Sequence, residues 1–397
     1  MNHTLSKSSM DIYFIIFIIL ILFFGESIQN YLNIKDGNSL IEQCFKLPYI
    51  FLYISLFKRA KHLKLTKIDK YLLFILGFAI FISIFLLNKR ASLGMFWQLI
   101  VIPLLLSGYL NTFIKRTYLR LRPIIVMFFI VECLIAIYEG YTQNILIDTG
   151  YDYLLDGLGD FRAHSLHGHG LQNSFIIIVI GVGILFSDYS YIIKYSLFLL
   201  GCGAIMAFNT RSGFYIYIGI FIVHLLYTII FTEKLNIRKR ILIIGISILL
   251  LFLIPIFISD LNLGTRLFIN SQNDGGSTNI RIATFNFLFS QSILDIIIGL
   301  PSNYTANFLK RTGYVAIENS FLIILFQNGL LFLITYIYLI YKKISGIIVN
   351  RFILFVFCGM LIALYNVNNI IATPAPSMII VFIVIYTFII PQESKTN

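Results

Sequence analysis

The sequence predicts an all-α fold, a polytopic integral membrane helix bundle, and three observations support that prediction. Of the 397 residues, 58% are hydrophobic and 12% are charged, whereas soluble globular proteins carry about 25% charged residues. Apolar runs long enough to cross a bilayer, about 20 residues each, follow one another along almost the whole chain. Lysine and arginine are concentrated in alternate connections between these runs, as in membrane proteins with a fixed orientation.

The apolar runs predict about twelve transmembrane helices in a single domain over residues 1–397. The first run, Ile12–Phe24, is followed by Gly-Glu-Ser-Ile-Gln rather than by a small-residue cleavage site, so we expect a retained helix and not a signal peptide. The predicted spans are roughly 11–28, 40–57, 71–88, 93–113, 123–141, 171–187, 191–208, 212–231, 241–258, 317–341, 352–371 and 374–390.

The distribution of basic residues predicts the orientation. Twenty of the 30 Lys and Arg residues lie in loops that would share one side with the N-terminus. Because cytoplasmic loops are enriched in these residues, we expect both termini in the cytoplasm. The net charge of +12 is then mostly an orientation signal, and we expect no nucleic-acid partner. The ten basic residues on the predicted outer side are Lys35, Lys46, Lys89, Arg90, Arg162, Arg211, Arg266, Arg281, Lys310 and Arg311.

Two of the predicted outer loops are long, about 142–170 and 259–316. Loops of more than about 12–15 residues are usually functional or disordered. The second loop contains an apolar stretch, 280–300, that polar residues interrupt. We expect it to form one helix that lies at the membrane surface or dips into it. A thirteenth span would move the basic pair Lys342 and Lys343 to the outer side.

The first cluster of candidate functional residues closes the first long loop. It contains Arg162, His164, His167, His169 and Asn173, with glycines around the histidines. Three interpretations are open: a structural or hydrogen-bonding role, substrate contact or proton transfer, and metal binding. Histidine is a common metal ligand, but His-x-x-His-x-His with one aspartate matches no closed zinc pattern. We therefore expect no metal site.

The second cluster, Asn209-Thr210-Arg211-Ser212-Gly213, lies between two predicted spans. An arginine in a short outer turn opposes the orientation signal, so it needs another explanation. The guanidinium group offers a rigid fork of donors that matches phosphate oxygens two at a time. The sequence therefore predicts phosphate or pyrophosphate binding by Arg211, and the alternative is contact with lipid headgroups.

The third cluster is a glycine-rich stretch that leads into a predicted helix, Gly275-Gly276-Ser277-Thr278-Asn279-Ile280-Arg281. Free N–H groups at a helix start favour anions, and Arg281 adds a formal positive charge. Together with Arg162 and Arg211 on the same predicted side, this cluster predicts an anion site at the outer leaflet.

The fourth cluster begins a predicted span with Glu318-Asn319-Ser320, and Gln327-Asn328-Gly329-Leu330 follows. A carboxylate at the membrane edge is suited to act as a general base for a sugar hydroxyl. An arginine partner or a helix N-terminal charge explains the same residue equally well, and both interpretations of Glu318 stay open here.

These features together resemble the O-antigen polymerase and ligase superfamily of bacterial surface polysaccharide assembly. The resemblance covers roughly residues 160–340 and rests on the order of short motifs and on their side of the membrane. The motifs are Thr210-Arg211-Ser212-Gly213, Arg281 after a Gly/Ser stretch, Leu294–Pro301, Glu318-Asn319-Ser320 and Gly329-Leu330.

The resemblance implies a glycosyltransferase of the bacterial inner (cytoplasmic) membrane that acts on glycans carried on undecaprenyl pyrophosphate at the outer leaflet. Such a transfer needs no nucleotide sugar, so we expect no cofactor and no metal. Arg211 and Arg281 would neutralise charge on the leaving pyrophosphate, and Glu318 would be the base. Substrate contacts are expected from Arg266 and Asn319 and from the first cluster. The implied partners are the carrier-linked glycan, membrane lipid, a chain-length regulator and a flippase.

One departure from the family pattern separates the possible activities. The ligase branch often has His-Asn where this chain has Glu318-Asn319, which favours a polysaccharide polymerase over an O-antigen ligase. A flippase or transporter is the second alternative, and such proteins often carry charges around a midplane cavity and a two-fold repeat. In this sequence the charges gather on one face and no repeat is visible. The motifs do not distinguish an O-antigen of lipopolysaccharide from a capsule.

Overall fold

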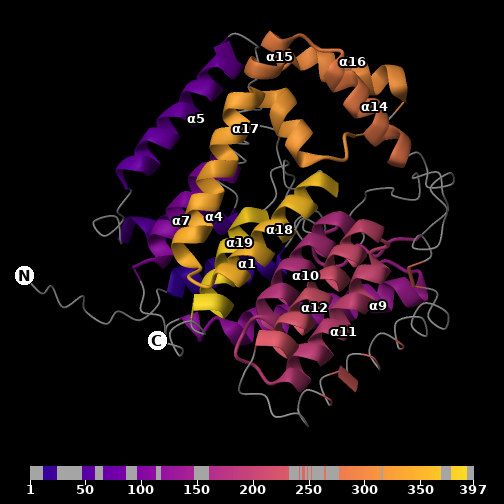
Figure 1. Cartoon of the computed structure of the whole chain (residues 1–397). Coiled ribbons are helices and arrows are strands. Elements are labelled where there is room, and N and C mark those ends of the chain that lie inside the picture. Colours follow the sequence, from indigo (N-terminus) through magenta and orange to yellow (C-terminus); the bar gives the residue numbers. More distant parts are fainter. Residues whose placement is uncertain are drawn as a thin grey trace, which may run out of the picture. The chain divides into compact units, whose positions relative to one another are not determined.

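The structure is a computed structural model, and the residues that it describes form helices joined by loops, without a strand among them (Figure 1). The all-α prediction is confirmed for this part of the chain. The described residues are 12–24, 47–58, 66–85, 96–112, 118–146, 161–231, 241, 244–245, 248, 252, 263–264, 277–313, 316–367 and 377–390.

Residue contacts divide the chain into two compact units, which we describe separately. Unit 1 comprises Met1–Ile18, Asp36–Tyr118 and Gly276–Phe382, and unit 2 comprises Ile19–Lys35, Leu119–Gly275 and Ile383–Asn397. Helices α1 (Ile12–Phe23) and α19 (Ser377–Val384) contribute residues to both units.

Unit 1 is built around the long helix α17, which contacts α5, α15 and α18. In Figure 1, α14, α15 and α16 lie beside the first part of α17, and they share an apolar core with it. Besides parts of α1 and α19, the helical elements of unit 1 are α4 (Leu47–Lys58), α5 (Lys67–Phe85), η2 (Trp97–Val101), α7 (Ile102–Leu110), α14 (Ser277–Phe289), α15 (Ile293–Ile298), α16 (Ser302–Thr312), α17 (Ser320–Ile347) and α18 (Arg351–Val367).

Unit 2 is a bundle in which α10 contacts α9, α11, α12 and the π-helical turn η7. Nearly every residue of α10 is buried, as expected for a helix that is apolar on all sides. The helical elements are α9 (Arg122–Thr142), α10 (Gly170–Leu185), α11 (Tyr191–Ala207), α12 (Arg211–Phe231) and η7 (Ile385–Ile389).

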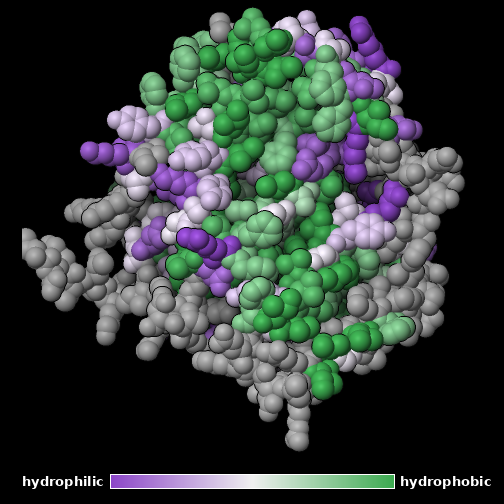
Figure 2. Space-filling view, viewed as in Figure 1, coloured by the Kyte–Doolittle hydropathy of each residue, from purple (hydrophilic) through white to green (hydrophobic). Residues whose placement is uncertain are grey.

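A described helix overlaps eleven of the twelve predicted spans, and the helix limits agree with the prediction to within a few residues for α9 to α12. Most of the remaining span, 241–258, lies outside the described residues. Three helices, α9, α12 and α17, are long and apolar enough to cross a membrane, and the other apolar helices are shorter. Apolar side chains also cover much of the visible surface (Figure 2). These helices are compatible with a membrane protein, while the number of twelve spans stays a prediction.

The expectation of one helix over 280–300 is wrong, because the structure has two, α14 and α15. Polar side chains explain the interruption. Ser290 Oγ and Gln291 Nε2 both donate to the Phe287 carbonyl oxygen (2.7 and 2.8 Å), and Ser292 caps the second helix by accepting from Asp295 N. Short polar side chains that bond to nearby backbone groups compete with a continuous helix.

Within each unit, an ion pair joins residues that the charge pattern assigns to the same side of the membrane. In unit 1, Lys343 Nζ binds Asp69 Oδ2 at 2.7 Å, which joins the predicted inner ends of α17 and α5. In unit 2, Arg122 forms an ion pair with Asp188 and donates to the Thr387 carbonyl oxygen. All five residues belong to the predicted inner side, so the predicted alternation of the helices agrees with the contacts.

Candidate functional site

The histidine loop of unit 2, residues 161–169, is fixed by a buried carboxylate of α9. Glu139 Oε2 accepts hydrogen bonds from the backbone N–H groups of His164 and Ser165, each at 2.8 Å, and Glu139 Oε1 accepts from Leu146 N at 2.9 Å. The Glu139 side chain is fully buried. One carboxylate therefore satisfies three backbone donors of the loops at this end of α9, which positions them rigidly.

Glu132 acts on the same loop from two turns earlier on the same face of α9. Its Oε2 accepts from Leu166 N at 3.3 Å, and its backbone carbonyl accepts from Ser165 Oγ. The observed partner of the Glu132 carboxylate is thus a backbone N–H group rather than a cation. The seven-residue spacing of the two glutamates, which places them on one helix face, is the signal that the sequence analysis did not use.

The three histidines make structural hydrogen bonds in this loop. His167, fully buried, donates from Nε2 to the Leu22 carbonyl oxygen at 3.0 Å, and burial lowers its pKa to about 4. His169 caps α10, because its Nδ1 accepts from Leu171 N. The His164 carbonyl oxygen accepts from Gly168 N and from Asn173 Nδ2. Among the described residues no group of His, Cys, Asp or Glu is arranged to bind a metal ion.

The loops that carry Arg162 and Arg211 contact each other. Asn209 Nδ2 donates to the Phe161 carbonyl oxygen at 3.3 Å, and Ala163 N donates to the Ala207 carbonyl oxygen at 3.0 Å. The structure therefore brings the first and second predicted clusters together at one end of unit 2. Both arginines are partly exposed, in contrast to the buried residues around them.

A second hydrogen bond fixes the start of α12, where Arg211 is the first residue. The hydroxyl groups of Ser174 in α10 and Thr210 lie 2.6 Å apart and share a hydrogen bond. A Cβ atom at Gly213 would lie 2.6 Å from Ser174 Oγ, so α10 and α12 approach closely here because position 213 is glycine. The Thr-Arg-Ser-Gly motif thus sets both the packing and the position of the arginine.

In unit 1 the third and fourth clusters are joined by an ion pair. Arg281 Nη2 lies 3.1 Å from Glu318 Oε2, and the two side chains are 38% and 32% exposed. Arg281 Nε is buried and has no hydrogen-bond partner in the described part of the chain. Glu318 has the arginine partner that one of the two interpretations expected, and its role as a base stays a prediction.

The residue after Glu318 organises the end of this helix. Asn319 caps α17, because its Oδ1 accepts from Leu322 N at 3.0 Å, and its Nδ2 donates to Asn366 Oδ1 at 3.4 Å. Asn366 lies near the end of α18. The Glu-Asn pair therefore places a carboxylate and a capped helix start beside the end of α18.

Helix α17 is broken at Gly329, which has φ 83° and ψ 170°. The break fits against α15: a Cβ atom at Gly329 would lie 2.2 Å from the Ile297 carbonyl oxygen, and Leu300 N donates to the Phe326 carbonyl oxygen at 2.7 Å. The motifs Leu294–Pro301 and Gly329-Leu330, which the sequence analysis listed separately, thus contact each other. This contact sets the direction of the segment that begins with Glu318.

Asn328, beside the break, was named in the sequence analysis without a role. It is 2% exposed, and neither its Oδ1 nor its Nδ2 has a hydrogen-bond partner within the described residues. A buried amide without partners costs about 1–3 kcal/mol. Asn328 therefore destabilises the segment of α17 next to the break.

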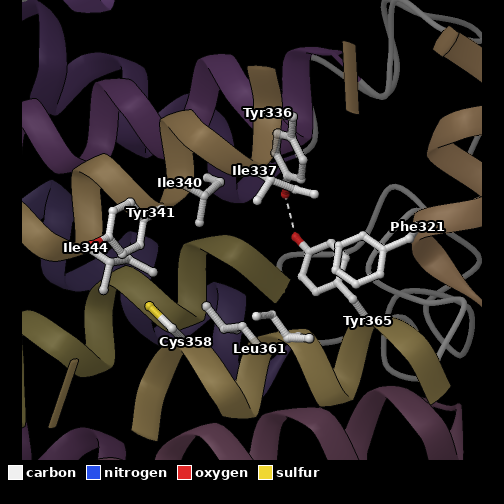
Figure 3. A pocket seen from close by; sticks show the side chains of 10 residues that line it. Phe321, Tyr336, Ile337, Ile340, Tyr341, Ile344, Cys358, Leu361 and Tyr365 are labelled. Carbon is white, nitrogen blue, oxygen red and sulfur yellow. Dashed lines mark hydrogen bonds between the residues drawn. The ribbon is translucent and has the colours of Figure 1, made fainter. Parts of the chain in front are cut away.

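An apolar cavity lies between α17 and α18, and we call it the α17–α18 groove. Figure 3 shows side chains of both helices pointing into it. Its volume is about 160 Å³. Residues that line it include Tyr336, Ile340, Ile344, Cys358, Leu361 and Tyr365.

The predicted substrate-contact residue Arg266 lies outside the described part of the chain. Comparison with protein-family models, with curated proteins and with solved structures finds no match to this chain. The site is therefore interpreted from its own residues: a rigid arginine-bearing loop region in unit 2, and a partly exposed arginine–glutamate pair in unit 1.

Proposed function

We propose that this protein is a metal-independent glycosyltransferase of the bacterial inner (cytoplasmic) membrane. It joins oligosaccharide repeat units carried on undecaprenyl pyrophosphate, at the outer leaflet, into a surface polysaccharide. The observation that carries the proposal is the Arg281–Glu318 pair, a guanidinium and a carboxylate 3.1 Å apart and partly exposed at the start of α17. This arrangement offers a cation for a phosphate and a proton acceptor for a hydroxyl at one place.

The proposed step is a displacement at the anomeric carbon of one lipid-linked chain. The hydroxyl oxygen of the second glycan forms the new bond to that carbon, and its proton passes to Glu318. The bond between the anomeric carbon and the pyrophosphate oxygen breaks, and the pyrophosphate leaves with the electron pair. Arg281 stabilises the negative charge that develops on this oxygen, as preorganised cations do in other active sites.

Contacts around Arg281 support a role in anion binding. Its Nη2 is occupied by Glu318, whereas its buried Nε has no acceptor among the described residues. A buried N–H donor without an acceptor costs free energy, and a phosphate oxygen would satisfy it. The family resemblance matches Arg211 to the same chemical role, and its loop is rigidly held by the hydrogen bonds of Asn209 and Thr210.

The proposal includes about twelve spans with both termini in the cytoplasm. Reporter tags inserted near residues 65, 118, 236 and 346 are expected to report the cytoplasm, and tags near 155 and 275 the outside, because of the distribution of basic residues. A cytoplasmic signal from a tag at 275 would remove Arg281 from the outer leaflet and overturn the proposal.

The decisive test is polymer formation in cells that carry single variants. Glu318→Gln keeps the size of the side chain and removes the proton acceptor, so we expect loss of polymer with normal amounts of protein in the membrane. Asp295→Asn, at a partly exposed acid of α15 that accepts a hydrogen bond from Ser292, is the matched control and should leave polymer unchanged. Wild-type chain length from Glu318→Gln would exclude this residue as the base.

The arginines are tested in the same way. Cells that carry Arg281→Lys or Arg211→Lys should make little polymer compared with wild type, because lysine lacks the bidentate fork of arginine. Arg311→Lys, at an exposed arginine of α16, is the control. Full polymer from a lysine variant would assign that arginine to lipid contact.

Products separate this proposal from its two alternatives. Deleting the gene should reduce a polysaccharide ladder to a single short band, because single repeat units still reach the surface acceptor. A ligase predicts instead that long carrier-linked chains accumulate and none reaches the acceptor. A flippase predicts that carrier-linked repeats stay on the cytoplasmic face.

A further inference from the structure

The α17–α18 groove offers only hydrocarbon to an occupant. Its two deepest polar groups, the hydroxyls of Tyr336 and Tyr365, bond to each other, and the Tyr365 hydroxyl donates to Met378 Sδ at 3.4 Å. The dashed line in Figure 3 marks the bond between the tyrosines. Because these hydroxyls are already satisfied, the groove gains nothing from a polar ligand. Cavities of about 150 Å³ lined by apolar side chains stay dry and bind small hydrocarbons.

The groove opens between apolar residues that the rest of the protein leaves uncovered. Ile337 is 41% exposed, Tyr341 50% and Ile362 54%, and all three line the groove. They lie on α17, which is long and apolar enough to cross a membrane, and on the apolar helix α18. In a membrane these positions face lipid chains, so an occupant enters from the hydrocarbon layer.

One end of the groove is formed by residues that lie close in sequence to the charged pair. Phe321 stacks on Tyr365 with ring centroids 4.9 Å apart, and both line the groove. Asn319 and Asn366, bonded to each other, are close neighbours of these rings in sequence. Glu318, which pairs with Arg281, directly precedes Asn319 in the sequence. In this order unit 1 has an ion pair, an amide pair, an aromatic pair and an apolar groove, which would complement an amphiphile with an anionic head.

We propose that the α17–α18 groove binds the polyprenyl chain of the lipid-linked substrate, with its phosphate at the Arg281 end. The identity of this lipid rests on the proposed function. The cavity volume of about 160 Å³ is close to that of the benzene-binding cavity of about 150 Å³, which suits one methyl-branched isoprene unit. The remainder of the chain stays in the bilayer. This contact fixes one segment of the lipid chain, and the Phe321–Tyr365 end of the groove is the end nearer to Glu318 in sequence.

Cys358 lines the groove and provides a direct assay. The protein is placed in lipid nanodiscs with Cys44, which lies outside the described residues, replaced by serine. Cys133 and Cys202 are buried, so an apolar maleimide should react mainly at Cys358, and Cys358→Ser serves as the blank. Farnesyl phosphate, hexadecyl phosphate and inorganic pyrophosphate are then compared as protecting ligands.

Farnesyl phosphate should slow labelling about tenfold at a concentration of about ten times its Kd, because only the unoccupied fraction reacts. Hexadecyl phosphate and pyrophosphate should protect little. Equal protection by hexadecyl phosphate would show a general lipid-chain site and overturn the polyprenyl assignment. Absence of protection by farnesyl phosphate would overturn the groove as a binding site.

A pair of variants tests the same inference without relying on catalysis. Ile362→Trp narrows the groove and should weaken protection by farnesyl phosphate about tenfold or more, equivalent to about 1.4 kcal/mol. Phe355→Trp, on the exposed side of α18 outside the groove, should change nothing. Protection of Ile362→Trp equal to wild type would contradict the proposal. Because the probe carries no sugar, protection without any effect of Glu318→Gln on polymer would reject the proposed function and retain the groove.

Discussion

The two arginine-bearing regions of this protein are built in opposite ways. In unit 2, buried carboxylates of α9 accept hydrogen bonds from the backbone of the loop that carries Arg162, and Glu139 alone satisfies three N–H groups. In unit 1, the carboxylate of Glu318 pairs with the Arg281 side chain, and both are about one third exposed. The difference indicates that the buried carboxylate shapes a loop, whereas the partly exposed carboxylate of Glu318 is the one for which we propose a role in proton transfer.

The largest expected effect tests the structural half of this comparison. Glu139→Ala leaves the buried backbone donors of His164 and Ser165 and the more exposed donor of Leu146 without their acceptor. At about 1–3 kcal/mol for each of the two buried donors, with a smaller term for Leu146, we expect a loss of about 5 kcal/mol. Thermal unfolding of the purified protein in detergent measures it. Glu139→Gln retains an acceptor oxygen and should lose less. If the alanine variant melts like wild type, the carboxylate does not organise the loop.

The next effect tests the helix break that positions Glu318. Gly329→Ala places a Cβ 2.2 Å from the Ile297 carbonyl oxygen at a φ of 83°. Backbone strain and the clash each cost about 1–3 kcal/mol, so we expect a loss of about 4 kcal/mol and loss of activity. Gly346→Ala is the control, because a Cβ there meets no atom within 4 Å. Equal stability of the two variants would mean that α17 tolerates a continuous helix.

A pH effect is expected from His167 in the buried loop. Its pKa in the folded protein, about 4, lies below the ordinary value of 6.5. Between these values the unfolded chain binds a proton that the folded protein does not, so stability is fully present above pH 6.5 and falls as the pH drops towards 4. The contribution is on the order of 3 kcal/mol.

Unfolding of wild type and His167→Gln across this pH range isolates that contribution. The variant keeps a donor for the Leu22 carbonyl oxygen but has no titrating group, so its stability should depend less on pH. Parallel pH curves for the two proteins would show that His167 takes up its proton without unfolding.

The smallest expected change in stability sharpens the comparison most. Glu318→Gln should change unfolding by less than about 1 kcal/mol, as for other exposed ion pairs, while it abolishes polymer. Glu139→Gln should instead lower the free energy of unfolding clearly, because it changes a buried acceptor of the loop. A large loss of stability in Glu318→Gln would identify this ion pair as structural and leave the base to another residue.

The sequence by itself determined that the described part of the chain is helical, and the alternation of its spans across the membrane stays a prediction. Length and hydropathy placed α9 to α12 within a few residues, since a helix buried among apolar neighbours needs a continuous apolar run and little else. Charge alone grouped residues as distant as Asp69 and Lys343 on one side, and their ion pair agrees with that grouping. Local capping chemistry is also readable, as Asn319 and Ser292 show.

Only the tertiary structure decided which polar groups became partners. The sequence could not show that Glu139 accepts from a loop about 25 residues later, because any buried carboxylate needs a partner and many donors were available. It could not place the break at Gly329, since glycine is tolerated inside apolar helices and the φ of 83° is forced by the backbone of α15. The α17–α18 groove likewise depends on where that break directs Phe321 relative to Tyr365, and such long-range packing is specified by three-dimensional fit rather than by any local pattern.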